Sequence, residues 1–131
     1  MSQVYADAAD FEALFTQMFD QIESDDPDAM NELVDQQMVI RFKLKSPGVE
    51  LWIDGRSKPV HASFGTGRNT ADLTAELSAN SLHELLLGTL GLAQGLLFRK
   101  IKVRGDKGKA MKLESLLHAM QTVYPDLVSN R

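Results

Sequence analysis

Histidines are the residues in this sequence best suited to acid–base or metal chemistry, and they lie far apart in the chain. The three are His61, His83 and His118, and only Glu114 stands at short helical spacing from one of them, four residues before His118. A zinc site needs at least three protein ligands, and the sequence contains no cysteine. The pattern therefore predicts a solvated Glu114–His118 helix pair rather than a metal site, and we expect no metal or cofactor.

Motifs for nucleophilic or phosphate chemistry are also missing from the sequence. It has no Gly-x-Ser-x-Gly elbow, the turn that exposes a nucleophilic serine in many hydrolases. The run Gly105-Asp-Lys-Gly-Lys-Ala110 superficially resembles a phosphate-binding loop. It lacks the four-residue gap between glycines and the closing Ser or Thr that would hold magnesium. We expect no enzymatic activity.

Charge is divided unevenly along the chain. Residues 1–37 carry ten acids and no Lys or Arg, whereas seven of the fourteen basic residues fall between Arg99 and Lys112. Such a basic run either forms a docking face for an anionic partner or balances a nearby acidic segment. A nucleic-acid site would need aromatic side chains interleaved with the basic residues. None lies between Lys100 and Arg104, so no nucleic-acid partner is expected. The candidates for contact with an anionic head group or membrane surface are Lys100, Lys102, Arg104, Lys107 and Lys109.

Length and composition favour one globular domain over residues 1–131. The chain is 44% hydrophobic and 24% charged, as in ordinary globular proteins. Its first residues lack the basic and apolar regions of a signal peptide. No apolar run reaches the ~20 residues that a membrane-spanning helix needs. We expect a cytoplasmic protein without disulfides.

Hydrophobic periodicity indicates the secondary structure. Helical spacing predicts acidic leading helices at 10–23 and from Pro27, a helix from Ser81 to Gly88 with a Ser81/Glu84 capping box, and a last helix at 107–122. Tyr124-Pro125 is expected to stop that last helix. Alternation of period two predicts strands at residues 38–45, 49–54, 60–65, 72–78 and 100–104. The layout is that of an α+β protein with one sheet and helices on one face.

The first two strands are predicted to form a hairpin. Pairing Leu44 with Leu51 and Phe42 with Ile53 aligns the apolar faces and leaves Pro47-Gly48 as a two-residue turn. A bulge or a longer loop remains an alternative, because Pro-Gly fits the twist of a hairpin poorly. The order of the strands that follow is not determined by the pattern.

The stretch from Leu82 to Phe98 is unusually rich in leucine. It holds eight leucines and three glycines in seventeen residues. Either this stretch fills an ordinary core or it forms the wall of a cavity for an apolar ligand. Gly88, Gly91 and Gly95 are candidate bends that would let such a wall curve.

The segment around this stretch resembles a known family. Ala71-Asp72-x-Thr74, Leu85 to Gly88, and Lys100-Ile-Lys-Val-x-Gly105-Asp-x-Gly108-x-Ala110-Met-Lys-Leu113 are similar to the sterol carrier protein 2 domain of nonspecific lipid-transfer proteins. The resemblance implies a five-stranded, mostly antiparallel sheet covered on one face by helices and enclosing an apolar tunnel. It also implies a hydrophobic small-molecule partner: a sterol, a fatty acid or an acyl-CoA-like lipid.

The resemblance implies a set of ligand-binding residues on the leucine-rich stretch and the last helix. These are Leu82, Leu85, Leu86, Leu92, Gln94, Leu96, Leu97, Phe98, Met111, Leu116 and Met120. The function expected is non-catalytic binding of a lipid, as a carrier or a sequestering module, with transient contact to an anionic membrane surface. The alternative is a scaffold or dimerisation module that holds a partner protein or a prenyl-chain intermediate, for which a homodimer is a further possibility.

Overall fold

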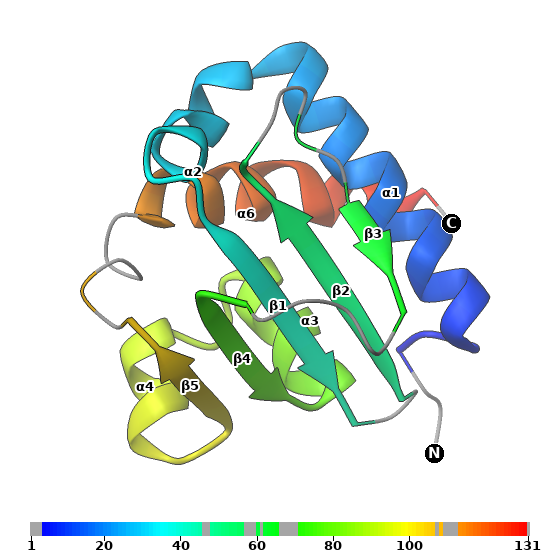
Figure 1. Cartoon of the computed structure of the whole chain (residues 1–131). Helices are drawn as coiled ribbons and strands as arrows, with labels where there is room; N and C mark the ends of the chain where they lie inside the picture. Colours follow the sequence, from blue (N-terminus) through cyan, green and yellow to red (C-terminus); the bar gives the residue numbers. More distant parts are fainter. Residues whose placement is uncertain are drawn as a thin grey trace.

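The protein folds into one mixed five-stranded sheet with helices packed on one of its faces (Figure 1). The computed structural model describes residues 4–45, 48–56, 60, 62–65, 71–106, 108 and 113–130. The elements in chain order are α1 (Ala8–Asp25), η1 (Pro27–Met30), α2 (Asn31–Asp35), β1 (Val39–Leu44), β2 (Val49–Asp54), β3 (Ala62–Phe64), β4 (Leu73–Leu77), α3 (Ala79–Leu87), α4 (Leu92–Leu97), β5 (Ile101–Gly105) and α6 (Glu114–Ser129).

The strand order in the sheet is β3-β2-β1-β4-β5. Three of its ladders are antiparallel, and the ladder between β1 and β4 is parallel. The predicted α+β class, with a mostly antiparallel five-stranded sheet covered on one face, is therefore confirmed. The sequence pattern did not predict the parallel pairing of β1 with β4, because it left the order of the later strands open.

Alternation along the strands builds the core. Ile40, Phe42 and Leu44 of β1 share a face with Leu51 and Ile53 of β2, and these residues belong to the core cluster or pack against it. Because side chains alternate between the two faces of a sheet, the residues between them point away from the helices.

The predicted register of the first hairpin is wrong by two residues. Leu44 lies opposite Val49 and Phe42 opposite Leu51, so the connection is the longer loop rather than the two-residue turn. A shift of two residues leaves the same side chains facing the core, because the strand period is two. Burial alone could not have distinguished the two registers.

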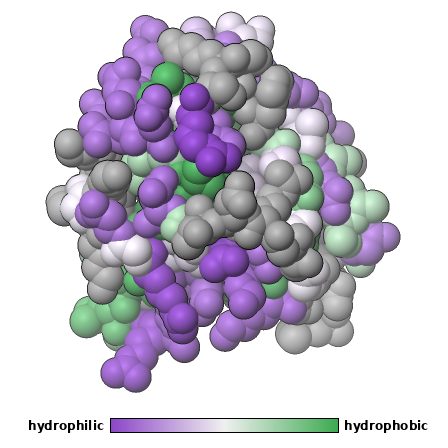
Figure 2. Space-filling model, viewed as in Figure 1, coloured by the Kyte–Doolittle hydropathy of each residue, from purple (hydrophilic) through white to green (hydrophobic). Residues whose placement is uncertain are grey.

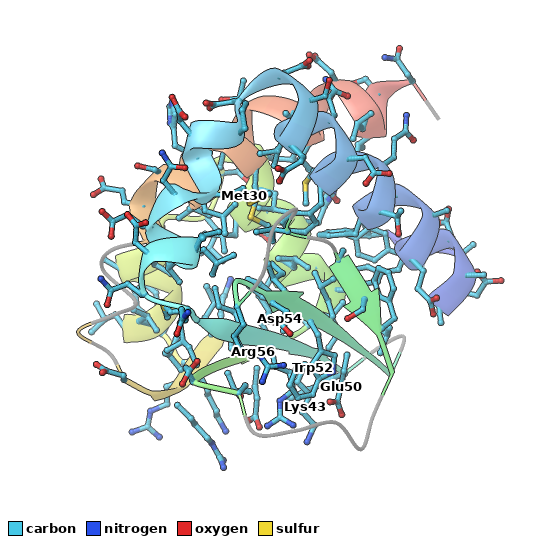
Figure 3. All side chains as sticks on the ribbon, turned by 45° about the horizontal axis from the view of Figure 1, so that its top comes forward. Met30, Lys43, Glu50, Trp52, Asp54 and Arg56 are labelled. Carbon is cyan, nitrogen blue, oxygen red and sulfur yellow. The ribbon has the colours of Figure 1, made fainter. Side chains whose placement is uncertain are left out.

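The outer face of the sheet carries a polar cluster around a tryptophan (Figure 3). The Trp52 side chain is buried and its Nε1 donates to the Gly65 carbonyl oxygen at 2.8 Å. The Arg41 guanidinium lies 5.3 Å from the Trp52 ring centroid, donates through Nε to Thr74 Oγ1 at 3.2 Å, and pairs with Glu50 at 3.6 Å. A cation–π contact and an ion pair thus join β1 to β2, and the Arg41–Thr74 hydrogen bond joins β1 to β4, on the side opposite the helices.

Asp72 joins the two halves of the sheet at the start of β4. Its carboxylate accepts from the Val39 backbone N–H at 2.8 Å, and its own N–H donates to the Val39 carbonyl at 2.8 Å. Its carbonyl accepts from the Asp106 N–H at 3.2 Å. Gly105 sits beside that carbonyl with φ of +108°, and a Cβ added there would overlap the Asp72 oxygen. Two positions of the family-like sequence therefore have a structural role.

Two helix boundaries differ from the prediction. α3 is capped by Ser78, whose Oγ accepts from the Ser81 N–H at 3.1 Å, so the predicted Ser81 cap lies inside the helix. α6 continues through Pro125 to Ser129. A proline inside a helix removes one hydrogen bond, and here the fully buried Tyr124 beside it secures that part of α6 against the core.

Candidate functional site

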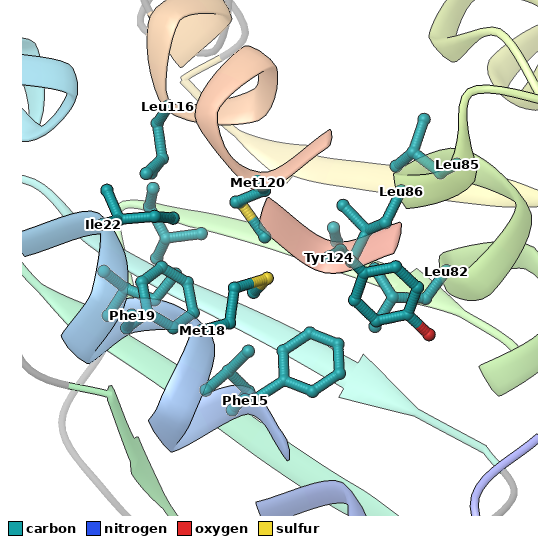
Figure 4. Packing of buried hydrophobic residues seen from close by; sticks show 14 of the residues in the cluster. Phe15, Met18, Phe19, Ile22, Leu82, Leu85, Leu86, Leu116, Met120 and Tyr124 are labelled. Carbon is teal, nitrogen blue, oxygen red and sulfur yellow. The ribbon is translucent and has the colours of Figure 1, made fainter. Parts of the chain in front are cut away.

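The apolar layer between the helices and the sheet is the candidate interior for a ligand. Its centre is shown in Figure 4, where side chains of α1, α3 and α6 converge. Five of the residues predicted to bind a ligand lie there, all of them buried: Leu82, Leu85, Leu86, Leu116 and Met120. In this structure they pack against one another in the core cluster, and the described residues do not show the predicted tunnel.

α1 contributes to the same layer, which the sequence analysis did not anticipate. Phe15, Met18 and Ile22 are fully buried and belong to the same cluster as Met120. Their helical stripe is recognisable in the sequence, but it lies outside the family-like segment, which begins at Ala71. Methionine side chains adapt their shape readily, and Met18 of α1 and Met120 of α6 both belong to this layer.

A chain of hydrogen bonds runs through one side of this layer. The Tyr5 and Tyr124 hydroxyls lie 2.7 Å apart, and the Tyr124 hydroxyl lies 2.7 Å from His83 Nδ1. Both tyrosines are fully buried. The sequence analysis missed this group because Tyr124 was expected to lie beyond the last helix, although it falls on the apolar stripe of α6 once that helix is continued.

Two polar contacts tie α3 to α6. One is the bond between His83 and Tyr124; in the other, Gln121 Nε2 donates to the Leu85 carbonyl oxygen at 3.0 Å. Buried apolar side chains of both helices, among them Leu82, Leu86 and Met120, belong to the same core cluster.

The other predicted ligand-binding residues lie on the surface at α4. Leu92 and Leu96 are each 43% exposed, Phe98 is 63% exposed and Leu97 is 75% exposed, and Gln94 is exposed as well. The structure thus separates the predicted set into a buried group on α3 and α6 and an exposed group on and just after α4. Ligand contact by either group stays a prediction.

The three candidate bends have local roles. Gly88 ends α3 in the left-handed conformation with φ of +81°, and Gly91 is the N-cap of α4. Gly95 is buried, and a Cβ there would meet the Ile101 side chain at 2.6 Å. The absence of a side chain at Gly95 thus lets α4 lie close against β5.

The predicted basic contacts fall partly within the described residues. Lys100, Lys102 and Arg104 are exposed on and next to β5, whereas Lys107, Lys109 and the predicted ligand-binding residue Met111 lie outside the described residues. Arg104 approaches Glu76 at 4.0 Å.

An open surface pocket of about 590 Å³ lies between η1 and the start of α6. Its lining consists of Asp26, Asp28, Ala29, Glu114, Ser115, Leu117, His118 and Gln121. The predicted Glu114–His118 pair therefore lines this surface pocket. Among the residues that the structure describes, no group of three or more His, Asp or Glu could hold a metal ion.

The sheet and the helices thus enclose one apolar layer, to which α1, α3 and α6 all contribute. The described helices include none long and apolar enough to cross a membrane. The family model of the SCP-2 sterol transfer family matches residues 15–118, so this chain belongs to that family. The expected resemblance is confirmed.

Individual relatives agree with the family assignment. Over 87 residues the chain is 26% identical to hydroxysteroid dehydrogenase-like protein 2 of Bos taurus, an alignment that covers 66% of this chain and 21% of that protein. The chain therefore spans about a fifth of the length of this curated relative. The solution structure of sterol carrier protein domain 2 of Helicoverpa armigera has a TM-score of 0.68 at 20% identity, covering 86% of this chain and 87% of that one. A ubiquinone synthesis protein, UbiJ-SCP2, has a TM-score of 0.63 at 17% identity, covering 85% and 88% respectively.

Proposed function

We propose that the chain acts as a single non-catalytic domain that binds one hydrophobic molecule between α1, α3, α6 and the sheet. A sterol, a fatty acid or an acyl-CoA-like lipid is the proposed ligand class, and the domain would carry or sequester it. Family membership provides the class of function. The observation that carries the location is the buried layer of Leu82, Leu85, Leu86, Leu116 and Met120, which faces the α1 stripe.

Ligand entry would require the packed layer to widen, and burial of a long alkyl chain would offset part of that cost. Separating α3 from α6 breaks the His83–Tyr124 and Gln121–Leu85 hydrogen bonds, each worth about 1 kcal/mol net. Burying an alkyl chain contributes ~0.8 kcal/mol for each CH₂ group. A ten-carbon chain would therefore gain about 8 kcal/mol before repacking of the core is counted, enough to offset the two lost hydrogen bonds.

Native mass spectrometry of the purified chain tests this proposal. We expect an adduct with one lipid molecule, or stoichiometric binding of a fluorescent fatty acid that an unlabelled sterol or fatty acid displaces. A chain that carries no lipid and binds neither the fluorescent fatty acid nor a fluorescent sterol would contradict the proposal.

The scaffold alternative is favoured by one observation, the exposed apolar side chains of α4. In this alternative the chain would hold a partner protein or a prenyl-chain intermediate, and the name of the UbiJ-SCP2 relative is consistent with such a setting. A concentration-dependent dimer in analytical ultracentrifugation, together with no binding of either fluorescent lipid, would support this alternative and a homodimeric state.

The place of ligand exchange completes the proposal. We place the domain in the cytoplasm and propose that it exchanges its ligand at an anionic membrane surface, with Lys100, Lys102 and Arg104 as the contacting residues, joined by Lys107 and Lys109. Exposure of the first three supports this role.

A further inference from the structure

We propose that the end of α4 is a membrane anchor, in which Leu96, Leu97 and Phe98 insert into the lipid layer while the neighbouring basic residues contact its anionic head groups. The inference rests on the proposed exchange at an anionic surface and names the element that inserts. The first observation is the exposure of Leu97 and Phe98, the most exposed large apolar side chains in the described part of the chain. Clustered exposed apolar side chains next to polar residues are typical of interaction sites.

The backbone holds these side chains outward. α4 ends in a closed turn in which the Lys100 N–H donates to the Gly95 carbonyl at 2.9 Å and the Arg99 N–H to the Leu96 carbonyl at 3.3 Å. Arg99 adopts φ of +59°, a conformation that glycine usually supplies at a helix end. The chain thus passes directly from α4 into β5, leaving Leu97 and Phe98 at the outermost point of the turn.

The positive charge around α4 favours an anionic partner. Residues 87–105 contain four basic residues and no acid. In the part of the chain that the structure describes, Arg99, Lys100 and Lys102 make no salt bridge, and Arg104 approaches Glu76 only at 4.0 Å. Basic residues beside exposed Leu and Phe are the combination found on surfaces that bind anionic membranes.

The rest of the molecule would orient this end toward the membrane. The ten acids of residues 1–37 belong mainly to α1, η1 and α2, which Figure 1 places at the opposite end of the molecule from α4. An anionic surface repels one end and attracts the other, so the charge distribution steers α4 toward it. Figure 2 shows hydrophobic atoms beside strongly hydrophilic ones at the lower left, where Figure 1 places α4 and β5.

A second copy of the chain fits this surface less well. β5 is an edge strand, so two copies could pair through it in antiparallel fashion around Val103. This pairing would set Lys102 of each copy opposite Arg104 of the other, and like charges directly opposite one another destabilise a strand pair. Lysine on an edge strand is a common feature that discourages such pairing.

Co-sedimentation with lipid vesicles tests the anchor, using the full chain. We expect the protein to bind phosphatidylcholine vesicles that contain phosphatidylserine, to bind pure phosphatidylcholine weakly, and to dissociate when salt is raised. The double variant Leu97→Ser/Phe98→Ser and the double variant Lys100→Gln/Lys102→Gln should each weaken vesicle binding ~10-fold or more. The matched control Lys45→Gln/Arg56→Gln removes the same charge from the ends of the β1–β2 hairpin and should change binding less than ~3-fold.

Three results would overturn the anchor. The first is equal binding to neutral and anionic vesicles, and the second is an equal loss of vesicle binding in the control and in the Lys100→Gln/Lys102→Gln variant. The third is a monomer–dimer equilibrium that Leu97→Ser/Phe98→Ser abolishes, which would assign α4 to contact with a second copy. Binding of the fluorescent fatty acid is measured on the Lys100→Gln/Lys102→Gln variant and should persist, because these two exposed side chains lie outside the buried layer. Loss of vesicle binding with retained fatty acid binding would therefore separate the anchor from the proposed ligand site. Vesicle binding by a chain that takes up no lipid would refute only the proposed ligand site.

Discussion

Replacing Gly105 with alanine should destabilise the protein strongly, although the added group is one methyl. The position has φ of +108°, where an L-residue is strained by about 1–3 kcal/mol. The new Cβ would also overlap the carbonyl oxygen of Asp72, and this backbone is fixed by its bonds to Val39 and Asp106. We expect the free energy of unfolding to fall by about 3 kcal/mol or more, which is a large part of the 5–15 kcal/mol typical of a domain.

Urea denaturation, monitored by circular dichroism, measures this change in the free energy of unfolding directly. Gly48→Ala is the matched control, because its Cβ would lie 3.9 Å from the nearest atom, the Lys45 carbonyl oxygen. We expect the control to stay within about 0.5 kcal/mol of the wild type. For a chain of this size, Gly105→Ala should also lower Tm by roughly 10 °C or more. A Gly105→Ala protein as stable as the Gly48→Ala protein would refute the assigned role of the β4–β5 contact.

Three further predictions concern the interior and the α4 turn. Met120→Trp adds bulk to the buried layer and should weaken fluorescent fatty acid binding ~10-fold, whereas Met120→Leu conserves volume and should change it less than ~3-fold; equal effects would move the ligand elsewhere. Arg99→Gly should raise the free energy of unfolding by about 1 kcal/mol, because glycine accepts the left-handed conformation, while weakening binding to anionic vesicles ~5-fold; a stability that falls would contradict the turn geometry. Tyr124→Phe should cost about 1–2 kcal/mol in urea denaturation, because Tyr5 and His83 each lose a hydrogen bond, and an unchanged midpoint would mean that the hydroxyl chain adds no stability.

Periodicity was sufficient to predict which strand residues face the core, but it could not fix how the strands pair. The hairpin register shows the limit, since Leu44 keeps its inward direction whether it faces Leu51 or Val49. The parallel pairing of β1 with β4 depends on contacts of Asp72 with Val39, 33 residues away, and no local pattern encodes it.

The candidate site was predictable in part for a related reason. Leu86 and Leu97 belong to the same leucine-rich stretch, yet one is fully buried and the other is 75% exposed. Composition assigns both to an apolar surface, and only the position of α4 beyond the sheet edge separates them. A proline normally ends a helix, so the sequence places Tyr124 outside the last helix, whereas α6 continues through Pro125 and buries Tyr124.

The parallel ladder between β1 and β4 has a consequence for cooperativity. It divides the sheet into a part formed before residue 65 and a part formed after residue 71, joined by a single ladder. α6 packs against both parts, on α1 and η1 from the first and on α3 from the second. Neither part can bury its apolar face alone, so the two halves of the sequence should unfold together. In native-state hydrogen exchange, the amides of this ladder should exchange at the same free energy as those of α6.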